Sequence, residues 1–514
     1  MHLRSCRLWP AVLALGFLAA CGSNKSADTT ISSAQVHDAV AQLDNVIADV
    51  MTRTGIPGMA VAVVHNGETI YSKGFGVRLV TEPALVDADT VFQLASLSKS
   101  VGASVVAAQV GKGIVDWSTP LTRHLPWFAL SDPQATTQLT IGDLYAHRSG
   151  LPDHAGDDLE EIGYSRRQIL EKLRFLPTKP LRSEYFYTNF GLTAGAQAVA
   201  VAAGTDWESL SEQDIYRPLG MQSTSSRYAD FIARTNRASP HIGVNGQFQP
   251  GPQRQPDAQS PAGGVSSSAH DMARWMKLIL AGGAYEGEQI IPSDALLPAL
   301  SPQMQTSPAT EDSAAGYYGY GFNLSTSSLG HVMYGHSGAF IMGTGTAFSL
   351  LPAANTGIVV LTNAWPVGAA EAVSLTYMDL VQFGRAHEDW VAFLKPYFAA
   401  MTAPEGELAG LPFPGNPIPP LPAHAYTGVY FNDYFGQASV EQAGGKLNLV
   451  MGPAGQTFPL QHWDGNTYVF EPDGEVAAPG SRSSVRFGIG PAGMAQDLSI
   501  EVFDKEGMGT LLRQ

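Results

Sequence analysis

A proline-rich segment near the C-terminus, residues 404–422, most constrains how this chain can fold. Before it, apolar residues recur at helical spacing in long stretches. After it, they alternate in short runs such as 446–451, which are separated by glycine, proline and asparagine. Proline disrupts helix interiors and central strands, and the 514 residues exceed what one core usually needs. The sequence therefore predicts two folded units, residues 35–403 and 423–514, joined by an extended linker at 404–422.

The larger predicted unit has strand-like runs at both ends and helical segments between them. Residues 59–64 and 69–71 flank an Asn66-Gly67 turn, which is typical of a hairpin, and residues 356–362 form a final apolar run. Apolar residues from Val36 onward recur at helical spacing, so this unit should open with a helix. We expect an α+β fold in which one antiparallel sheet, built from both ends of the unit, is flanked by helices. A small all-β barrel or sandwich follows it.

The first 21 residues are typical of an export signal. Arg4 and Arg7 precede an apolar stretch, residues 11–20, that is too short to span a bilayer. The stretch ends in Leu18-Ala19-Ala20-Cys21, which resembles a bacterial lipobox. We therefore expect lipidation at Cys21, a tether at residues 22–34, and an exported periplasmic lipoprotein anchored in the outer membrane. An ordinary signal peptide with an incidental cysteine is the alternative.

Charge and composition exclude several classes of partner. The formal net charge is −16 and no cluster of Lys and Arg is present, so we expect no nucleic-acid partner. His387-Glu388 begins a zincin-like string, but Val391 stands where the second His is required. The acidic run at residues 153–161 is interpreted as a solvated loop rather than a cation site. We expect no metal and no cofactor, and partners limited to a small-molecule or peptide substrate and a membrane reached through the lipid on Cys21.

Three short motifs carry the chemistry. Ser96 and Lys99 are three residues apart at the start of an Ala/Val-rich helical run, so they share a helix face and the amine can lie next to the hydroxyl. A partly buried lysine with a lowered pKa can activate a serine, and the helix N-terminus favours developing negative charge. Ser-x-x-Lys alone occurs often by chance. Tyr187-Thr188-Asn189 and His336-Ser337-Gly338 follow it, the latter ahead of an apolar strand-like run.

In order and rough spacing, these motifs resemble the signatures of class C β-lactamases, penicillin-binding-protein-like D-peptidases and related esterases. The resemblance covers roughly residues 37–365 and includes flanking stretches such as Gly55-Ile56-Pro57-Gly58 and Pro261-Ala262-Gly263-Gly264. It implies a β-lactamase/transpeptidase-like fold and a serine hydrolase. The C-terminal unit resembles lipocalin-like modules appended to some hydrolases of this family. Its role is either to cover the catalytic unit or stabilise the chain, or to shape substrate access.

The resemblance implies a role for each motif residue. Ser96 attacks a carbonyl and becomes an acyl-enzyme, while Lys99 and Tyr187 share the proton transfers; which of the two is the general base stays open. Asn189 holds Lys99 or the substrate amide. The backbone N–H groups of Ser96 and Ala339 form the oxyanion hole. The substrate-binding set is completed by His336, Ser337 and Gly338.

The third motif departs from the family pattern. His336 stands where β-lactamases and carboxypeptidases usually have a lysine that receives the substrate carboxylate, and an unperturbed imidazole is largely neutral at pH 7. We therefore expect esters, amides or D-amino-acid-containing peptides as substrates. A true β-lactamase or D,D-carboxypeptidase is one alternative. A non-catalytic lipoprotein that binds peptidoglycan is another.

Overall fold

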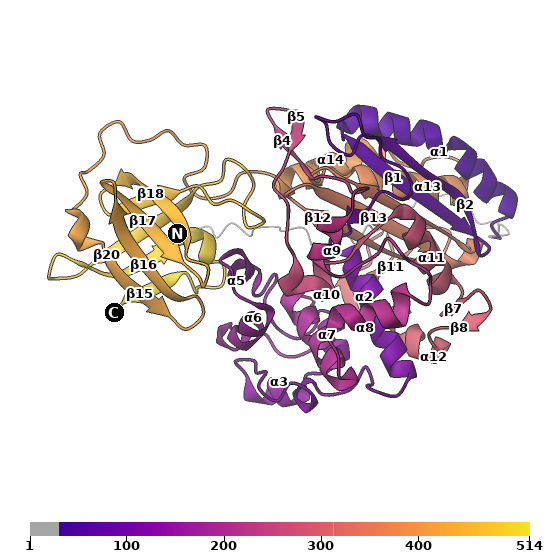
Figure 1. Ribbon diagram of the computed structural model, residues 1–514, viewed down its shortest axis with the longest axis horizontal. Coiled ribbons are helices and arrows are strands. Elements are labelled where there is room, and N and C mark those ends of the chain that lie inside the picture. Colours follow the sequence, from indigo (N-terminus) through magenta and orange to yellow (C-terminus); the bar gives the residue numbers. More distant parts are fainter. Residues whose placement is uncertain (1–29, 312) are drawn as a thin grey trace.

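The computed structural model describes residues 30–311 and 313–514. The predicted export signal, Cys21 and most of the predicted tether lie outside these residues. Figure 1 shows two parts: a large body of helices around a sheet, which ends in the helix Trp390–Met401, and a β-barrel at the C-terminal end of the chain. The predicted α+β class, with a helix-flanked antiparallel sheet followed by an all-β unit, is confirmed.

Eight antiparallel strands form the central sheet of the larger body, in the order β2-β1-β14-β13-β12-β11-β10-β9. Strand β1 lies between β2 and β14, with Val61 opposite Val360, so the two ends of this body meet in one sheet as predicted. The Asn66-Gly67 turn joins β1 to β2, and both residues have positive φ. The strands are β1 (Gly58–His65), β2 (Glu68–Gly76), β9 (Met304–Ser307), β10 (Gly316–Tyr318), β11 (Asn323–Thr326), β12 (Val332–Phe340), β13 (Thr344–Leu351) and β14 (Thr356–Thr362).

Helices cover both faces of this sheet, which is why every residue of β1 is buried. Met59, Val61 and Val63 pack in one core with α1 (Ser33–Thr54), α13 (Ala369–Phe383) and α14 (Trp390–Met401). The alternating residues of β1 face a second core, built with α2 (Leu97–Gly111), α7 (Asn189–Ala203) and α11 (Ala269–Leu280). Helix α1 confirms the predicted opening helix. No helix in the described part of the chain is long and apolar enough to cross a membrane.

Shorter elements fill the space between these layers. The helices are α3 (Pro133–Gln138), α4 (Ile141–Tyr145), α5 (Asp157–Glu161), α6 (Arg166–Lys172), α8 (Trp207–Ser211), α9 (Tyr228–Ala233), α10 (Ser260–Gly263) and α12 (Ser293–Leu296). The two-stranded pairs are β3 (Phe92–Gln93) with β6 (Ser266–Ser267), β4 (His241–Val244) with β5 (Gln247–Pro250), and β7 (Ala284–Tyr285) with β8 (Glu288–Gln289).

The C-terminal strands close into an eight-stranded barrel, which decides between the predicted barrel and sandwich. Each strand pairs with the next, and the last pairs with the first. Alternating apolar residues such as Tyr430, Val440 and Leu449 are buried, so side chains fill the barrel. The strands are β15 (Gly428–Asn432), β16 (Gly436–Ala443), β17 (Lys446–Met451), β18 (Gln456–Asp464), β19 (Thr467–Phe470), β20 (Ser483–Ile489), β21 (Ala495–Ile500) and β22 (Thr510–Arg513).

The proline-rich linker is not a free spacer, because it makes hydrogen bonds to the barrel along its length. The N–H of Ile418 donates to Asp464 at 2.6 Å, and the N–H of Gly465 donates to the Ile418 carbonyl at 2.9 Å. Arg482 donates to the Leu411 carbonyl at 2.7 Å. Proline has no N–H to donate to a strand ladder, so this segment joins no barrel strand and is held by irregular contacts instead. The linker therefore follows the barrel surface.

The barrel docks against α5 and α6 of the larger body (Figure 1). The Tyr164 hydroxyl donates to the Phe435 carbonyl at 2.7 Å, and the Lys172 ammonium donates to the Asp433 carbonyl at 2.8 Å. In the opposite direction, the Tyr434 hydroxyl donates to Asp158 at 2.9 Å. These directional contacts fix the barrel next to the loop that carries the acidic run.

Candidate active site

Ser96 lies at the N-terminus of α2, on a turn that is held from several sides. It is the N-cap residue of the helix, yet its hydroxyl makes no capping bond and is left for chemistry. The preceding Ala95 has φ of 47°, a conformation that L side chains rarely adopt and that often marks a functional turn. The N–H of Leu94 donates to the Val265 carbonyl at 2.8 Å, which anchors the approach to the turn. The helix N-terminus favours negative charge near Ser96.

Lys99 is fully buried one turn into α2, beside Ser96. Its amine lies 3.1 Å from Ser96 Oγ, 2.7 Å from Asn189 Oδ1 and 3.0 Å from the Ala262 carbonyl. Burial lowers the pKa of Lys99 to about 7, against the opposing effect of the Asp157 charge. When the amine is neutral, its two hydrogens satisfy the two carbonyl oxygens. The lone pair then faces Ser96 Oγ, which is the geometry of a general base.

Tyr187 approaches Ser96 from the other side. Its hydroxyl donates to Ser96 Oγ at 2.7 Å, and its ring faces the Lys99 amine at 4.5 Å. Burial raises the pKa of Tyr187 well above its usual value, so the phenol stays protonated at neutral pH. The N–H of Tyr187 donates to Asp153 at 2.6 Å, and its ring packs on the buried His147 at 4.6 Å. Tyr187 is therefore placed as a proton donor.

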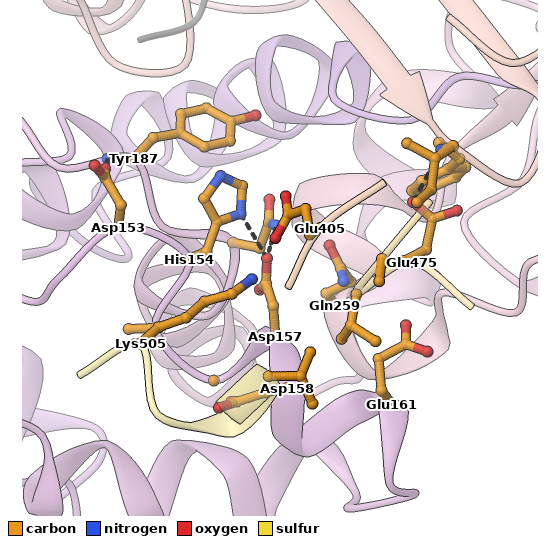
Figure 2. Close-up of a pocket in the computed structure, with 18 of the residues that line it drawn as sticks. Asp153, His154, Asp157, Asp158, Glu161, Tyr187, Gln259, Glu405, Glu475 and Lys505 are labelled. Atoms are coloured by element: carbon orange, nitrogen blue, oxygen red, sulfur yellow. Dashed lines mark hydrogen bonds and ion pairs between the residues drawn. The ribbon is translucent and has the colours of Figure 1, made fainter. Parts of the chain in front are cut away.

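The side-chain amide of Asn189 bridges Lys99 and Asp157. It is the first residue of α7, and its Nδ2 donates to Asp157 Oδ2 at 2.8 Å while its Oδ1 faces Lys99. His154 donates to the same Asp157 oxygen at 2.8 Å (Figure 2). The interpretation of residues 153–161 as a solvated loop is therefore wrong. The run continues into α5, and its Asp157 holds the amide of Asn189 in place. A row of carboxylates in a sequence does not predict such a role.

The third motif brings the edge of β12 against the Ser96 turn. Beyond Gly335, which is the last partner of β11, β12 is paired only with β13. A Cβ atom on Gly338 would lie 2.9 Å from Ser96 N and 2.6 Å from the Leu94 carbonyl oxygen, so glycine is needed for this approach. Ala339 follows and lines the same pocket as Ser96.

The two side chains that open the third motif are engaged elsewhere. His336 is 3% exposed; its Nδ1–H donates to the Ser337 carbonyl at 2.6 Å, and its Nε2 accepts from the Tyr318 hydroxyl at 2.9 Å. Burial and the nearby Lys99 lower the pKa of His336 to about 3, so it stays neutral. His336 is not part of the pocket surface that holds Ser96. The Ser337 hydroxyl donates to the buried Glu371, although Ser337 does line the pocket.

Ser96 opens into a pocket of about 240 Å³ between the two parts of the molecule. Figure 2 shows acidic side chains of the larger body facing Lys505 and Glu475 of the barrel. Sequence reasoning missed the barrel residues, which no local motif marks, and it quoted Ala262 only within the stretch Pro261-Ala262-Gly263-Gly264, without a role at Lys99. Within the described residues, no group of three or more His, Cys, Asp or Glu is arranged to hold a metal ion. The barrel contributes Tyr434, Glu475, Val476, Ala477, Ala478, Val502, Phe503, Lys505, Glu506 and Met508.

Comparisons with known proteins agree with this architecture. A family model described as Beta-lactamase matches residues 43–382, and one described as a domain of unknown function, DUF3471, matches residues 414–510. The unguisins hydrolase ungD of Aspergillus violaceofuscus is 25% identical over 487 residues, or 87% of this chain and 85% of that protein. The D-alanyl-D-alanine-carboxypeptidase/endopeptidase AmpH of Escherichia coli is 26% identical over 243 residues, or 45% and 60%. The octameric penicillin-binding protein homologue from Pyrococcus abyssi shares the fold, with a TM-score of 0.59 and 18% identity over 92% of this chain and 100% of that one.

Proposed function

Because the chain belongs to the beta-lactamase family, we propose that it is a serine hydrolase that forms an acyl-enzyme on Ser96. Its substrates are esters, amides or peptides that contain D-amino acids. One observation carries the proposal: the Ser96 hydroxyl lies 3.1 Å from a buried lysine amine and 2.7 Å from a protonated phenol. The relatives described above include a hydrolase and a carboxypeptidase/endopeptidase, which supports hydrolysis of acyl compounds.

The geometry supports separate roles for Lys99 and Tyr187 in proton transfer. Lys99, with a pKa near 7, takes the Ser96 proton as Oγ attacks the carbonyl carbon. The N–H groups of Ser96 and Ala339 receive the oxyanion. Tyr187 gives its proton to the leaving group. The Lys99 ammonium then passes its proton to the Tyr187 phenolate, so both groups return to their starting states. In deacylation, a water molecule attacks the acyl carbon and gives its proton to Lys99 and Tyr187. The bond to Ser96 Oγ breaks, and Oγ receives that proton back.

The charge of the pocket favours neutral or amine-bearing substrates over anionic ones. Arg254 is bonded to Glu160 and Glu161, and the ammonium of Lys505 opposes the burial-driven rise in the pKa of Asp158. Carboxyl groups outnumber these cations in the lining, so a substrate carboxylate would be repelled at pH values where these groups are ionised. This supports the proposed substrates over a true β-lactamase or a D,D-carboxypeptidase. The lining carboxyl residues are Asp153, Asp157, Asp158, Glu161, Glu405, Glu475 and Glu506.

Purified protein and a Ser96→Ala variant, assayed on four probes, test this proposal. The probes are a neutral nitrophenyl ester, an aminoacyl nitroanilide with a free amine in both stereoisomers, its N-acetylated form, and nitrocefin. We expect Ser96-dependent turnover, with the free amine preferred to its acetylated form and nitrocefin turned over slowly. Efficient nitrocefin hydrolysis would favour the β-lactamase alternative. If none of the probes is turned over, a non-catalytic binding protein is favoured. The lowered pKa of the buried Lys99 argues for catalysis, because such shifts are typical of active sites.

The location of the protein is a separate proposal, because Cys21 lies outside the described residues. We propose that Cys21 is lipidated and that the exported protein is anchored to the outer membrane. The support is the sequence Leu18-Ala19-Ala20-Cys21 after a short apolar stretch.

A further inference from the structure

We propose that Glu475 of the barrel is a positioning residue for the oxyanion hole, and that the barrel is thereby part of the hydrolytic machinery. This inference rests on the proposed function, because it assigns the oxyanion hole to the N–H groups of Ser96 and Ala339. It gives the C-terminal unit a definite task, where the sequence left open whether that unit covers the larger body or shapes the site.

Glu475 reaches out of the barrel and binds the end of β12. One of its carboxyl oxygens accepts the N–H of Ile341 at 3.0 Å, and the other accepts the N–H of Met342 at 3.0 Å. These two residues begin the turn between β12 and β13, and only Phe340 separates them from Ala339. A carboxylate that accepts two adjacent N–H groups fixes both the position and the orientation of a turn.

The end of β12 needs such an anchor. Gly335 is the last residue of β12 that pairs with β11, so the segment from His336 to Phe340 is held in the sheet only by β13. An edge segment with one partner moves more easily than a central strand. An oxyanion hole works only when its donors are fixed before the charge develops. On this side, β11 does not extend far enough to pair with His336–Phe340. Glu475, from the barrel, holds the end of this segment instead.

The same cluster also reaches the Ser96 side of the oxyanion hole. Glu475 interacts electrostatically with Arg254, whose guanidinium bonds Glu160 and Glu161 of the larger body. The backbone carbonyl of Arg254 accepts the side-chain N–H of Gln93 at 2.9 Å, and Gln93 lies in β3, just before the Ser96 turn. Thus one cluster around Arg254 touches the strand that leads to Ser96 and the turn that follows Ala339.

The cost of this cluster indicates that it is more than a contact between domains. Three partly buried glutamates lie around one buried guanidinium, and burial raises the pKa of Glu475 to about 7. Apolar side chains would join two domains without that desolvation cost. The two oxygens of a carboxyl group can each accept one of the two turn N–H groups, which an apolar side chain cannot do.

Three full-length variants test the role: Glu475→Ala, Glu475→Gln, and Glu471→Gln as a matched control. Glu471 is another barrel glutamate, but its side chain is 72% exposed and its nearest cation is Arg482 at 3.8 Å. We expect Glu475→Ala to lower kcat for a neutral ester about 10- to 100-fold, since one oxyanion donor contributes at least that much, with KM changed less than about 3-fold. Glu475→Gln keeps one acceptor and should lie between Glu475→Ala and wild type. Glu471→Gln should match wild type.

Hydrogen exchange of the amides of Ile341 and Met342 gives a readout that does not depend on activity. We expect faster exchange at both amides in Glu475→Ala while the thermal unfolding temperature and the far-UV spectrum stay close to wild type. Unchanged exchange and unchanged kcat in that folded variant would overturn the inference, as would a loss that falls on KM alone. If Glu475→Ala does not fold, Glu475→Gln, which keeps the side-chain volume, is judged by the same two readouts. Failure of Ser96 to be acylated in wild type would instead overturn the proposed function, and the exchange data would still report on the anchor.

Discussion

Replacing Asp157 by asparagine should shift the pH at which the protein becomes active. Asn189 bridges Asp157 and Lys99 through hydrogen bonds of 2.8 and 2.7 Å. The two charges therefore lie about 7 Å apart, and at an effective dielectric constant near 20 they attract by about 2 kcal/mol. That energy corresponds to about 1.5 pKa units on Lys99. An asparagine at 157 keeps an oxygen for the Asn189 amide but removes the charge.

Lys99 must be neutral to act as base, so kcat/KM for a neutral ester should rise with pH through the pKa of about 7. In Asp157→Asn the midpoint should fall to about 5.5, since the charge that favours the ammonium is gone. Glu506→Gln is the matched control, because Glu506 lines the same pocket but is not among the groups that shift the pKa of Lys99. Its midpoint should stay near that of wild type. A midpoint that is unchanged or raised in Asp157→Asn would refute the assignment of Lys99 as the base.

Two further predictions rest on the structure, and a third rests on the sequence around Cys21. Tyr187→Phe keeps the ring that packs on His147 and removes the donor to Ser96, so kcat for an amide should fall by about 100-fold or more; equal rates in the two proteins would exclude Tyr187 as the acid. The pKa of Glu475 is raised from 4.5 to about 7 by burial, so its contribution to stability is full below pH 4.5 and is lost as pH rises through 7. The unfolding temperature of wild type should therefore fall relative to that of Glu475→Gln over this range, and a constant difference would contradict the assignment. Cys21→Ser should release the protein from the membrane fraction, as judged by fractionation, and retention there would argue against a lipid anchor.

The parts of the fold that could be predicted from the sequence are those set by local patterns. Helical spacing places Ser96 and Lys99 on one face of α2 whatever surrounds them, and the apolar runs at 59–64 and 356–362 are long enough to mark strands of one sheet. Alternation in the C-terminal unit identified strands. It could not tell a barrel from a sandwich, because closure depends on the pairing of β15 with β22 and not on any one strand.

The parts of the site that could not be predicted depend on contacts between distant segments. A row of carboxylates such as 153–161 is usually solvated, and only the docked barrel and Arg254 make this one part of a pocket. His336 was expected at the substrate. Its burial, with both ring nitrogens bonded, depends on Tyr318 from another strand. Glu475 carries no motif at all, because its function depends on where the barrel docks.

The most direct test of the central proposal is intact-protein mass spectrometry after brief exposure to a fluorophosphonate, followed by peptide mapping. The electrophilic phosphorus of the fluorophosphonate reacts with an activated serine, and one of its oxygens then lies in the oxyanion hole. We predict one adduct per chain, on Ser96, that is absent in Ser96→Ala and in Lys99→Met. An unmodified wild-type protein, or an adduct on any other residue, would contradict the proposal that Ser96 is the nucleophile.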